Sequence, residues 1–331
     1  MSPSKSKSVA LALQGGGTHG AFTWGVIDHL LLDGRLRVES ISASSGGAIL
    51  AAMVAQGMLQ NGTEGARELL AQFWKKLSIA SSMLPLRMKV VDQFLGHVGF
   101  DFNAGTMALD MVTRLFSPQQ FNLFDINPLR GIVEELVDFD ALNAKSPVRL
   151  HINATNARTG KSHIFTEQNI SLEAVMASAC LPYLFKPVEI EGEAFWDGSF
   201  SGCPPLSPLV NEGISDIVLV QVHPSSVEDA PATPADILDR ATEISFQAVL
   251  NQELKTIELY NRLISAPQYP VAVHRIEAQD MLASLGRSSK LNADWDFLNY
   301  LHDLGTQAAT DFISSNYSAI GSTRPAASSA A

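Results

Sequence analysis

Two turns near the beginning of the chain combine the residue types that ester hydrolysis needs. The first is a glycine loop, Gly15-Gly16-Gly17-Thr18-His19-Gly20, between an apolar strand and a helix. The second is Ser42-Ala43-Ser44-Ser45-Gly46-Gly47, where a strand turns directly into another helix. A serine on such a tight turn is typical of the nucleophile elbow of acyl hydrolases. The backbone N–H groups of a neighbouring glycine loop can stabilise the oxyanion that forms when the serine attacks an ester.

The glycine loop also satisfies the spacing G-x-G-x-x-G, which in other proteins holds the pyrophosphate of a dinucleotide. A dinucleotide site needs an acidic residue at the carboxyl end of the second strand, where it binds the ribose hydroxyls. Here Glu39 lies at the beginning of that strand, and the strand ends in the serine-rich turn. The pattern therefore favours acyl transfer over nucleotide binding.

Ser44 and Ser45 both have a glycine two positions further on, so the spacing alone leaves two candidates. Ser45 follows a small hydroxyl residue and precedes two glycines, which lets a strained turn pack under the helix. We predict Ser45 as the nucleophile. We expect Ser44 to pack or to form a hydrogen bond beside the turn.

Asp197 lies at the end of an apolar segment and directly before Gly198. An aspartate in this position usually forms a turn, because its carboxylate binds backbone amides two residues on. A chain with a nucleophile and an oxyanion loop also needs a base, and a carboxylate can supply it. The sequence therefore predicts Asp197 as that base.

His223 offers a second interpretation, since Ser45, Asp197 and His223 occur in the chain order of the α/β-hydrolase triad. It ends a strand and precedes Pro224, so it would lie at the edge of the sheet where sites form. A histidine at a strand end is more often a hydrogen-bonded structural residue. Both interpretations of His223 stay open on these grounds.

Four motifs in this order resemble the patatin-like phospholipases over residues 9–225. They are the loop Gly15-Gly16-Gly17-x-x-Gly20, the Ser45 turn, the segment Ala177-Ser178-x-x-x-Pro182-x-x-Phe185, and Asp197-Gly198. The later run Ser289-Lys290-Leu291-Asn292-Ala293-Asp294-Trp295-Asp296-Phe297-Leu298 resembles bacterial members of this family. Four motifs in a fixed order are far more specific than any one of them.

The resemblance implies a catalytic dyad of Ser45 and Asp197 without a histidine, and it implies neither a metal nor a cofactor. It implies that the amides of Gly15, Gly16 and Gly17 form the oxyanion hole. We also expect accessory roles for His19, Gly46 and Gly198.

Two positions depart from the family pattern. Ala43 stands where the elbow usually begins with glycine, and its methyl group is tolerated if its φ is negative. His19 stands where the loop usually has Arg or Lys, which replaces a permanent positive charge by a side chain that is mostly neutral at pH 7. The second change concerns headgroup preference rather than the dyad.

The elements that would position these residues alternate between strands and helices. We predict strands at 9–13, 38–43, 148–155, 162–166, 216–222 and 271–276, and helices at 21–32, 48–55, 64–77, 104–116, 128–137, 171–179, 234–265 and 294–313. This alternation indicates an α/β fold, a three-layer sandwich with a mostly parallel central sheet.

We expect one patatin-like domain over residues 9–315 between mobile tails at 1–8 and 316–331. Residues 78–140 would form a helical cap or lid, and residues 234–315 a helical C-terminal part. The run Ile79–Phe102 is rich in Leu, Met and Val, which would suit either a core helix or an apolar lid over Ser45.

The composition limits the partners. A formal net charge of −11 would repel nucleic acid and anionic membranes, so a lipid contact would have to be mainly apolar. The first apolar run ends at Leu13 before the glycines, which is too short for a signal peptide. We therefore expect a cytoplasmic protein with reduced Cys180 and Cys203 that touches membranes or lipid droplets transiently. The sequence does not indicate an oligomeric state.

Together these features predict a serine acyl hydrolase of the lipase or phospholipase A type, acting on fatty-acyl esters. A thioesterase and a polyhydroxyalkanoate-type depolymerase would use the same residues on another acyl donor. A lipid-binding homologue without catalysis is a further alternative, which the departure at Ala43 suggests.

Overall fold

A mixed β-sheet forms the centre of the computed structural model, which describes residues 6–95, 117–118, 127–227, 230–264, 270–278, 282, 285 and 287–322. The strands follow the order β5-β6-β3-β2-β1-β7-β8, and β4 also pairs with β3. The neighbours β3, β2, β1, β7 and β8 pair in parallel. The pairs that involve β4, β5 or β6 are antiparallel. The strands are β1 (Lys7–Leu13), β2 (Leu36–Ser44), β3 (Arg149–Asn156), β4 (Ser162–Phe165), β5 (Val188–Ile190), β6 (Glu193–Trp196), β7 (Asp216–Gln221) and β8 (Ala272–Glu277).

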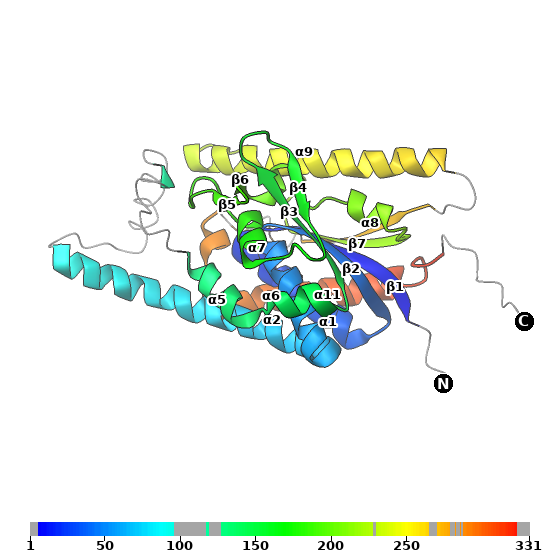
Figure 1. Cartoon of the computed structure of the whole chain (residues 1–331), viewed down its shortest axis with the longest axis horizontal. Helices are drawn as coiled ribbons and strands as arrows, with labels where there is room; N and C mark the ends of the chain where they lie inside the picture. The colour runs from blue at the N-terminus through cyan, green and yellow to red at the C-terminus, as the bar shows by residue number, and fades with distance from the viewer. Residues whose placement is uncertain are drawn as a thin grey trace, which may run out of the picture.

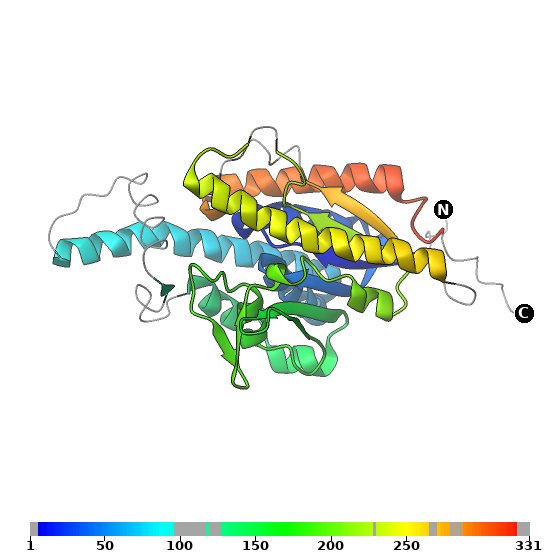
Figure 2. The same ribbon diagram turned by 90° about the horizontal axis from the view of Figure 1, so that it is seen from above.

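Helices cover both faces of the sheet, as Figures 1 and 2 show. The helices are η1 (Gly17–His19), α1 (Gly20–Asp33), α2 (Gly46–Leu95), α5 (Pro128–Leu136), α6 (Phe139–Lys145), α7 (Leu172–Ser178), η2 (Gly198–Phe200), α8 (Ser207–Asn211), α9 (Pro234–Leu263), η3 (Arg287–Leu291) and α11 (Trp295–Asn316). The predicted three-layer α/β sandwich with a mostly parallel sheet is therefore confirmed.

The alternation of side chains along β1 accounts for the two layers of helices. Leu11 and Leu13 belong to one apolar cluster with Phe22 of α1, and this cluster also takes in α2 and α11. Ala10 and Ala12 point the other way, into a second cluster that contains Leu250 and Ile257 of α9. Successive residues of a strand face opposite sides, so the residues from Val9 to Leu13 are all buried, whichever side they face.

The helix that follows Ser45 is longer than predicted. We predicted two helices, at 48–55 and 64–77, with the first one ending at Gly57. The label α2 (Gly46–Leu95) covers two helical parts, and the break between them lies at Asn61 and Gly62, whose φ values are −150° and 61°, so the first part continues past Gly57. Gly57 lies against the next turn of chain, because a Cβ at Gly57 would come 2.4 Å from Cα of Ala66. The glycine thus permits a close contact instead of ending a helix.

The predicted cap lies only partly within the described structure. In Figure 1 the end of α2 extends beyond the sheet, and α5 and the start of α6 form the last part of the segment 78–140. The predicted helix at 104–116 lies outside the described residues, and so does the end of the run Ile79–Phe102. The hairpin of β5 and β6 was not among the predicted strands.

The fold extends further at both ends than we expected. β1 begins at Lys7, and the Lys7 ammonium donates hydrogen bonds of 2.6 Å to the carbonyl groups of Tyr317 and Ile320. Ile320 is buried, so residues 316–322 belong to the fold and not to a tail. In the ranges given above, no helix is both long and apolar enough to cross a membrane.

Asp216 fixes this C-terminal segment from the start of β7. Its buried carboxylate accepts hydrogen bonds from Ser215 Oγ at 2.7 Å, His274 Nε2 at 3.0 Å and the Gly321 N–H at 3.0 Å. Burial alone would raise the pKa of Asp216, but the bonds from His274, Gly321 and Ser215 outweigh it and lower the pKa. A lowered carboxyl pKa stabilises the fold above the unfolded value, and this stability is lost as the pH falls through the folded value.

We therefore expect Asp216→Asn to lower the free energy of unfolding at pH 7 by about 1–3 kcal/mol, the usual value of hydrogen bonds to a charged group. The difference should begin to narrow below about pH 4, where Asp216 of the unfolded chain is protonated, and it should disappear as the pH falls through the lower pKa of the folded protein. Urea denaturation at several pH values measures it. Glu277→Gln, which removes an exposed partner of Arg275 on β8, is the control and should cost less than about 0.5 kcal/mol. Equal stability of wild type and Asp216→Asn at pH 7 would contradict the assignment.

Candidate active site

Two strands approach the same point from opposite directions. β2 pairs with β3 up to the pair Ser44–Asn153, and β6 pairs with β3 through Thr155–Trp196. β4 occupies the other edge of β3 at both positions, so β2 and β6 lie end to end along one edge. Because they run antiparallel to each other, both carboxyl ends meet there. Ser45 follows one of these ends and Asp197 follows the other.

Ser45 has the backbone of a nucleophile elbow. Its φ is 57°, a left-handed conformation that residues other than glycine rarely adopt and that costs on the order of 1–3 kcal/mol. Its N–H donates to Ser178 Oγ at 3.0 Å, and its carbonyl accepts the N–H of Ala48 at 2.9 Å in the first turn of α2. The turn is thus held on both sides, and its side chain is half-buried at the edge of the sheet.

The other residues of this turn have structural contacts. The Ser44 hydroxyl is buried and donates to the carbonyl of Gly202. Ala43 is the last residue of β2 that pairs with β1, opposite Leu13, and its φ is not positive. The methyl group of Ala43, where the family pattern has glycine, is therefore accommodated without backbone strain.

The glycine loop touches Ser45 so closely that no side chain fits between them. A Cβ at Gly15 would lie 2.3 Å from Cβ of Ser45 and 2.8 Å from its Oγ. β1 and β2 are adjacent and parallel, so both turns leave the sheet at the same edge. Gly17 has a φ of 60°, and a Cβ there would meet the carbonyl of Lys290 at 2.5 Å. Gly16 lies against Val222 at the end of β7.

Gln14 anchors the loop, and the sequence did not reveal it. Its Oε1 accepts the N–H groups of Val222 at 3.0 Å and His223 at 3.1 Å, and its Nε2 donates to the carbonyl of Cys203 at 3.3 Å. These partners lie about 190 to 210 positions away in the chain, so no local pattern could have indicated them.

Asp197 is completely buried and is fixed through its backbone. Its N–H donates to the carbonyl of Cys180 at 2.8 Å, and its carbonyl accepts from Thr155 Oγ1 at 2.8 Å. Gly198 lies so near β3 that a Cβ would come 2.0 Å from the carbonyl of Asn153, whose side-chain amide donates to the Gly198 carbonyl at 2.6 Å. Asn153 is thus a further residue that the sequence did not single out.

The two oxygens of the Asp197 carboxylate differ. Oδ1 accepts the N–H of Ser199 at 2.9 Å, as in a turn, whereas the buried Oδ2 has no hydrogen-bond partner. Burial raises the pKa of Asp197 to about 6, and interactions with the Ser45 hydroxyl and with Ser199 limit this rise. The Ser45 hydroxyl therefore lies near the carboxylate but forms no hydrogen bond of good geometry with Oδ2 in this conformation.

His223 belongs to the surroundings of the glycine loop. Burial, together with Lys290 and His19, lowers the pKa of His223 to about 3. No histidine affects the pKa of Asp197, so nothing indicates that the His223 ring contacts this carboxylate. His19 is also buried. Its Nε2 lies 2.7 Å from Ser289 Oγ, and burial and Lys290 lower the pKa of His19 to about 4, so the ring is neutral at pH 7.

A pocket of about 430 Å³ opens next to the loop, with His19 and Lys290 in its wall and residues of α9 opposite. In the described part of the chain, no group of three or more His, Cys, Asp or Glu side chains could hold a metal ion. In the described residues, the buried Cys180 and Cys203 form no disulfide, and Cys180 Sγ donates to the Lys186 carbonyl at 3.0 Å.

This arrangement combines three groups with complementary chemistry. They are a hydroxyl on a strained turn, an ionisable carboxyl group with an unused oxygen, and a loop whose backbone can approach without side chains. Such a set can perform proton transfer and nucleophilic attack, with backbone N–H groups near the developing negative charge.

A family model described as Patatin-like phospholipase matches residues 11–210 of the chain. No curated protein matches the sequence. VipD from Legionella pneumophila is similar in structure, with 14% identity, coverage of 93% of this chain and 67% of that chain, and a TM-score of 0.43. For the type III effector protein ExoU the values are 15%, 93% and 53%, with a TM-score of 0.39. The chain therefore spans about half the length of ExoU, and at these TM-scores the likeness carries no argument about substrates.

We expect Gly15→Ala to lower the rate of ester hydrolysis at least 100-fold, on the order of the loss of an oxyanion donor, because the new methyl group must displace Ser45 or the loop. Initial rates with a short-chain ester measure it. Gly131→Ala is the matched control: it lies in α5 with nothing within 4 Å of the new Cβ, and it should leave the rate unchanged. A fully active Gly15→Ala protein would show that the loop is not close to the reaction.

Proposed function

The chain belongs to the patatin-like phospholipase family, and from this we propose that it hydrolyses fatty-acyl esters of lipids with Ser45 as the nucleophile and Asp197 as the general base. The observation that carries the proposal is the meeting of β2 and β6 on one edge of β3. It directs a serine on a strained turn and a buried carboxylate with an unused oxygen to the same point.

In the first half-reaction Ser45 Oγ attacks the ester carbonyl carbon while its proton passes to Asp197 Oδ2. The carbonyl oxygen of the ester becomes an oxyanion, which the N–H groups of Gly15, Gly16 and Gly17 would stabilise. The intermediate then collapses to an acyl-enzyme, and Asp197 returns the proton to the leaving alcohol. In the second half-reaction water gives a proton to Asp197 while its hydroxide attacks the acyl carbon. The bond to Ser45 Oγ then breaks, Asp197 returns the proton to Oγ, and the fatty acid is released.

The raised pKa of Asp197 suits this role. A carboxyl group with a pKa of about 6 is still mostly ionised at pH 7, yet it is a stronger base than an exposed aspartate. The empty position at Oδ2 leaves room for the proton. A dyad needs no histidine if the carboxylate accepts the proton directly, and the low pKa of His223 favours a neutral structural ring.

The departure at Ala43 no longer supports the alternative of a lipid-binding homologue without catalysis. That alternative rested on strain at Ala43, and Ala43 has no positive φ. All four candidate acyl donors would use the same nucleophile and base. Rates of hydrolysis of lysophospholipid, triglyceride, acyl-CoA and a hydroxyalkanoate polyester therefore have to be compared to identify the substrate class. We expect the fatty-acyl oxygen esters to be hydrolysed fastest.

We expect Ser45→Ala to abolish hydrolysis and covalent labelling by a fluorophosphonate, with the fold intact by circular dichroism. Ser44→Ala is the neighbouring control and should retain measurable activity, since its hydroxyl is bonded to Gly202. An inactive Ser44→Ala protein beside an active Ser45→Ala protein would make Ser44 the nucleophile.

We expect Asp197→Asn to lower kcat by about 10²–10⁴-fold, the usual contribution of a general base, whereas His223→Ala should cost far less. The rate of the wild type should fall about tenfold per pH unit below pH 6, because only the ionised carboxylate accepts the proton. The pH profile of kcat/KM measures this.

A measurement of stability distinguishes a loss of catalysis in Asp197→Asn from unfolding of this variant. A carboxyl pKa raised by burial gives its full stability below the unfolded value and loses it as the pH rises through about 6. Ionised Asp197 therefore costs the wild type on the order of 3 kcal/mol at pH 8, and Asp197→Asn should be at least as stable there. Equal losses of activity in Asp197→Asn and His223→Ala would instead indicate a triad.

A further inference from the structure

The 3₁₀ helix η3 supports the glycine loop from the far end of the chain. Thr18 Oγ1 donates to the Ser289 carbonyl at 2.7 Å, and His19 Nε2 lies 2.7 Å from Ser289 Oγ. The Lys290 carbonyl fills the space beside Gly17, where a Cβ would be only 2.5 Å away. The loop therefore has Ser45 on one side and η3 on the other. These contacts involve the run of Ser289 to Leu298, for which the proposed chemistry has no other use.

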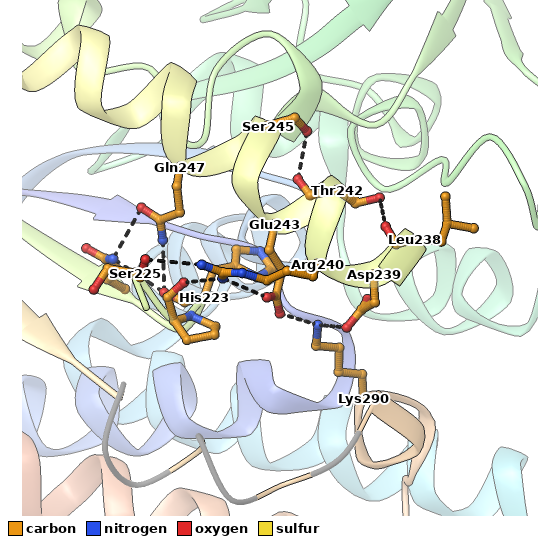
Figure 3. Close-up of polar contacts among 12 residues, drawn as sticks. His223, Ser225, Leu238, Asp239, Arg240, Thr242, Glu243, Ser245, Gln247 and Lys290 are labelled. Atoms are coloured by element: carbon orange, nitrogen blue, oxygen red, sulfur yellow. Dashed lines mark hydrogen bonds and ion pairs between the residues drawn. The ribbon is translucent and has the colours of Figure 1, made fainter. Parts of the chain in front are cut away.

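A double ion pair fixes η3 in turn. Lys290 Nζ donates to Asp239 Oδ2 and to Glu243 Oε1, both at 2.7 Å, and Figure 3 shows the lysine reaching from η3 to these two residues of α9. The side chains are largely shielded, with exposed fractions of 20% for Lys290 and 9% for Glu243. Pairs shielded from water are screened less by salt and are held in a more definite geometry than surface pairs.

The same part of α9 also binds the segment after β7, which supports the glycine loop through Gln14. Arg240 donates to Glu243 Oε2 at 3.2 Å and to the Pro224 carbonyl at 3.3 Å, and Gln247 donates to the His223 carbonyl at 2.9 Å (Figure 3). The segment after β7 is the one that receives Gln14, the residue before the loop. α9 thus links both supports of the loop through its own side chains.

These charges are arranged for positioning and not for capture of an anion. Lys290 and Arg240 line the pocket of about 430 Å³, but each already contacts a carboxylate. Asp239 and Glu243 neutralise the lysine, so it offers little net charge to a phosphate in the pocket.

We infer that Lys290 is a positioning residue for the oxyanion hole: its ion pairs with Asp239 and Glu243 hold η3 against Thr18 and Gly17 and so fix the glycine loop in the conformation that receives the oxyanion. The inference rests on the proposed function of the loop. Gly17 has no side chain and a left-handed backbone, so the loop cannot hold this conformation by its own packing. A displacement of about 1 Å at a site of this kind can cost about 100-fold in rate.

The test compares Lys290→Met, Lys290→Arg and Asp239→Asn with wild type on a soluble short-chain ester. We expect Lys290→Met to lower kcat by about 100-fold with little change in KM, and to slow fluorophosphonate labelling in parallel. Asp239→Asn should give a smaller loss, and Lys290→Arg should restore most of the rate because it keeps the charge. The pH midpoint set by Asp197 should not move, since Lys290 does not affect the pKa of Asp197.

Lys76→Met is the matched control. It removes a lysine that also donates to a carboxylate, Glu135, at 2.8 Å and 3.0 Å, but between α2 and α5. Hydrogen exchange gives a readout that does not require catalysis: amides of residues 14–20 should exchange faster in Lys290→Met and not in Lys76→Met. If Lys290→Met does not fold, the milder Asp239→Asn carries the same comparison.

Unchanged kcat and unchanged exchange at residues 14–20 in Lys290→Met or Asp239→Asn would overturn the inference. A fall in rate together with a shifted pH midpoint would also overturn it, because the lysine would then act on the dyad. Failure of the proposed function looks different: Ser45→Ala and wild type would hydrolyse esters equally, while exchange at residues 14–20 would still respond to Lys290→Met.

Discussion

The contact between Gly15 and Ser45 is the constraint on which the rest of the site depends. The two residues leave adjacent parallel strands, and the space between them does not admit a single methyl group. Ser45 cannot retreat easily, because its left-handed backbone is held by Ser178 and by the first turn of α2. The loop therefore has to be placed from its other side. Gln14, Thr18 and His19 are the residues that connect it to β7 and η3.

The burial of Asp197 places a second demand on the structure. A buried carboxylate with one oxygen that accepts no hydrogen bond lowers the stability of the fold. Hydrogen bonds to the backbone on either side of Asp197 hold the carboxylate in this position. Asn153 and Thr155 on β3 bind the carbonyl groups of Gly198 and Asp197, so the position of the carboxylate is set by the centre of the sheet. Strain and desolvation are concentrated at the same point, as is common at functional sites.

The sequence predicted the features that arise from local patterns. The strands around the two turns and the helices predicted at 128–137 and 171–179 follow from periodicity and end signals, and they agree with the structure. Gly57 was misread because a glycine required by a close contact looks the same as one that ends a helix. The hairpin of β5 and β6 was missed because strands of three and four residues carry almost no periodicity.

The residues around the candidate site show the same limit. Ser45, Asp197 and the three glycines could be proposed from short motifs, whereas Gln14 and Asn153 act through partners distant in the chain. Ser178 belongs to a motif, but the motif did not indicate its contact with Ser45. Lys290 lies in a run that the sequence singled out without indicating its contact with Asp239 and Glu243. Which side chains meet across a sheet or between a 3₁₀ helix and a loop is decided by the fold as a whole.

The end-to-end placement of β2 and β6 on β3 also bears on how the length of this chain can vary. Ala154 alone separates the residue that pairs with Ser44 from the residue that pairs with Trp196. Each residue of a strand spans about 3.3 Å, and successive side chains point to opposite faces of the sheet. One residue inserted in β3 at this point would therefore separate the ends of β2 and β6 and turn one of them to the opposite face. The exposed turns at 157–161 and 191–192 have no such role. Insertions and deletions should therefore accumulate in those turns and be excluded from the middle of β3.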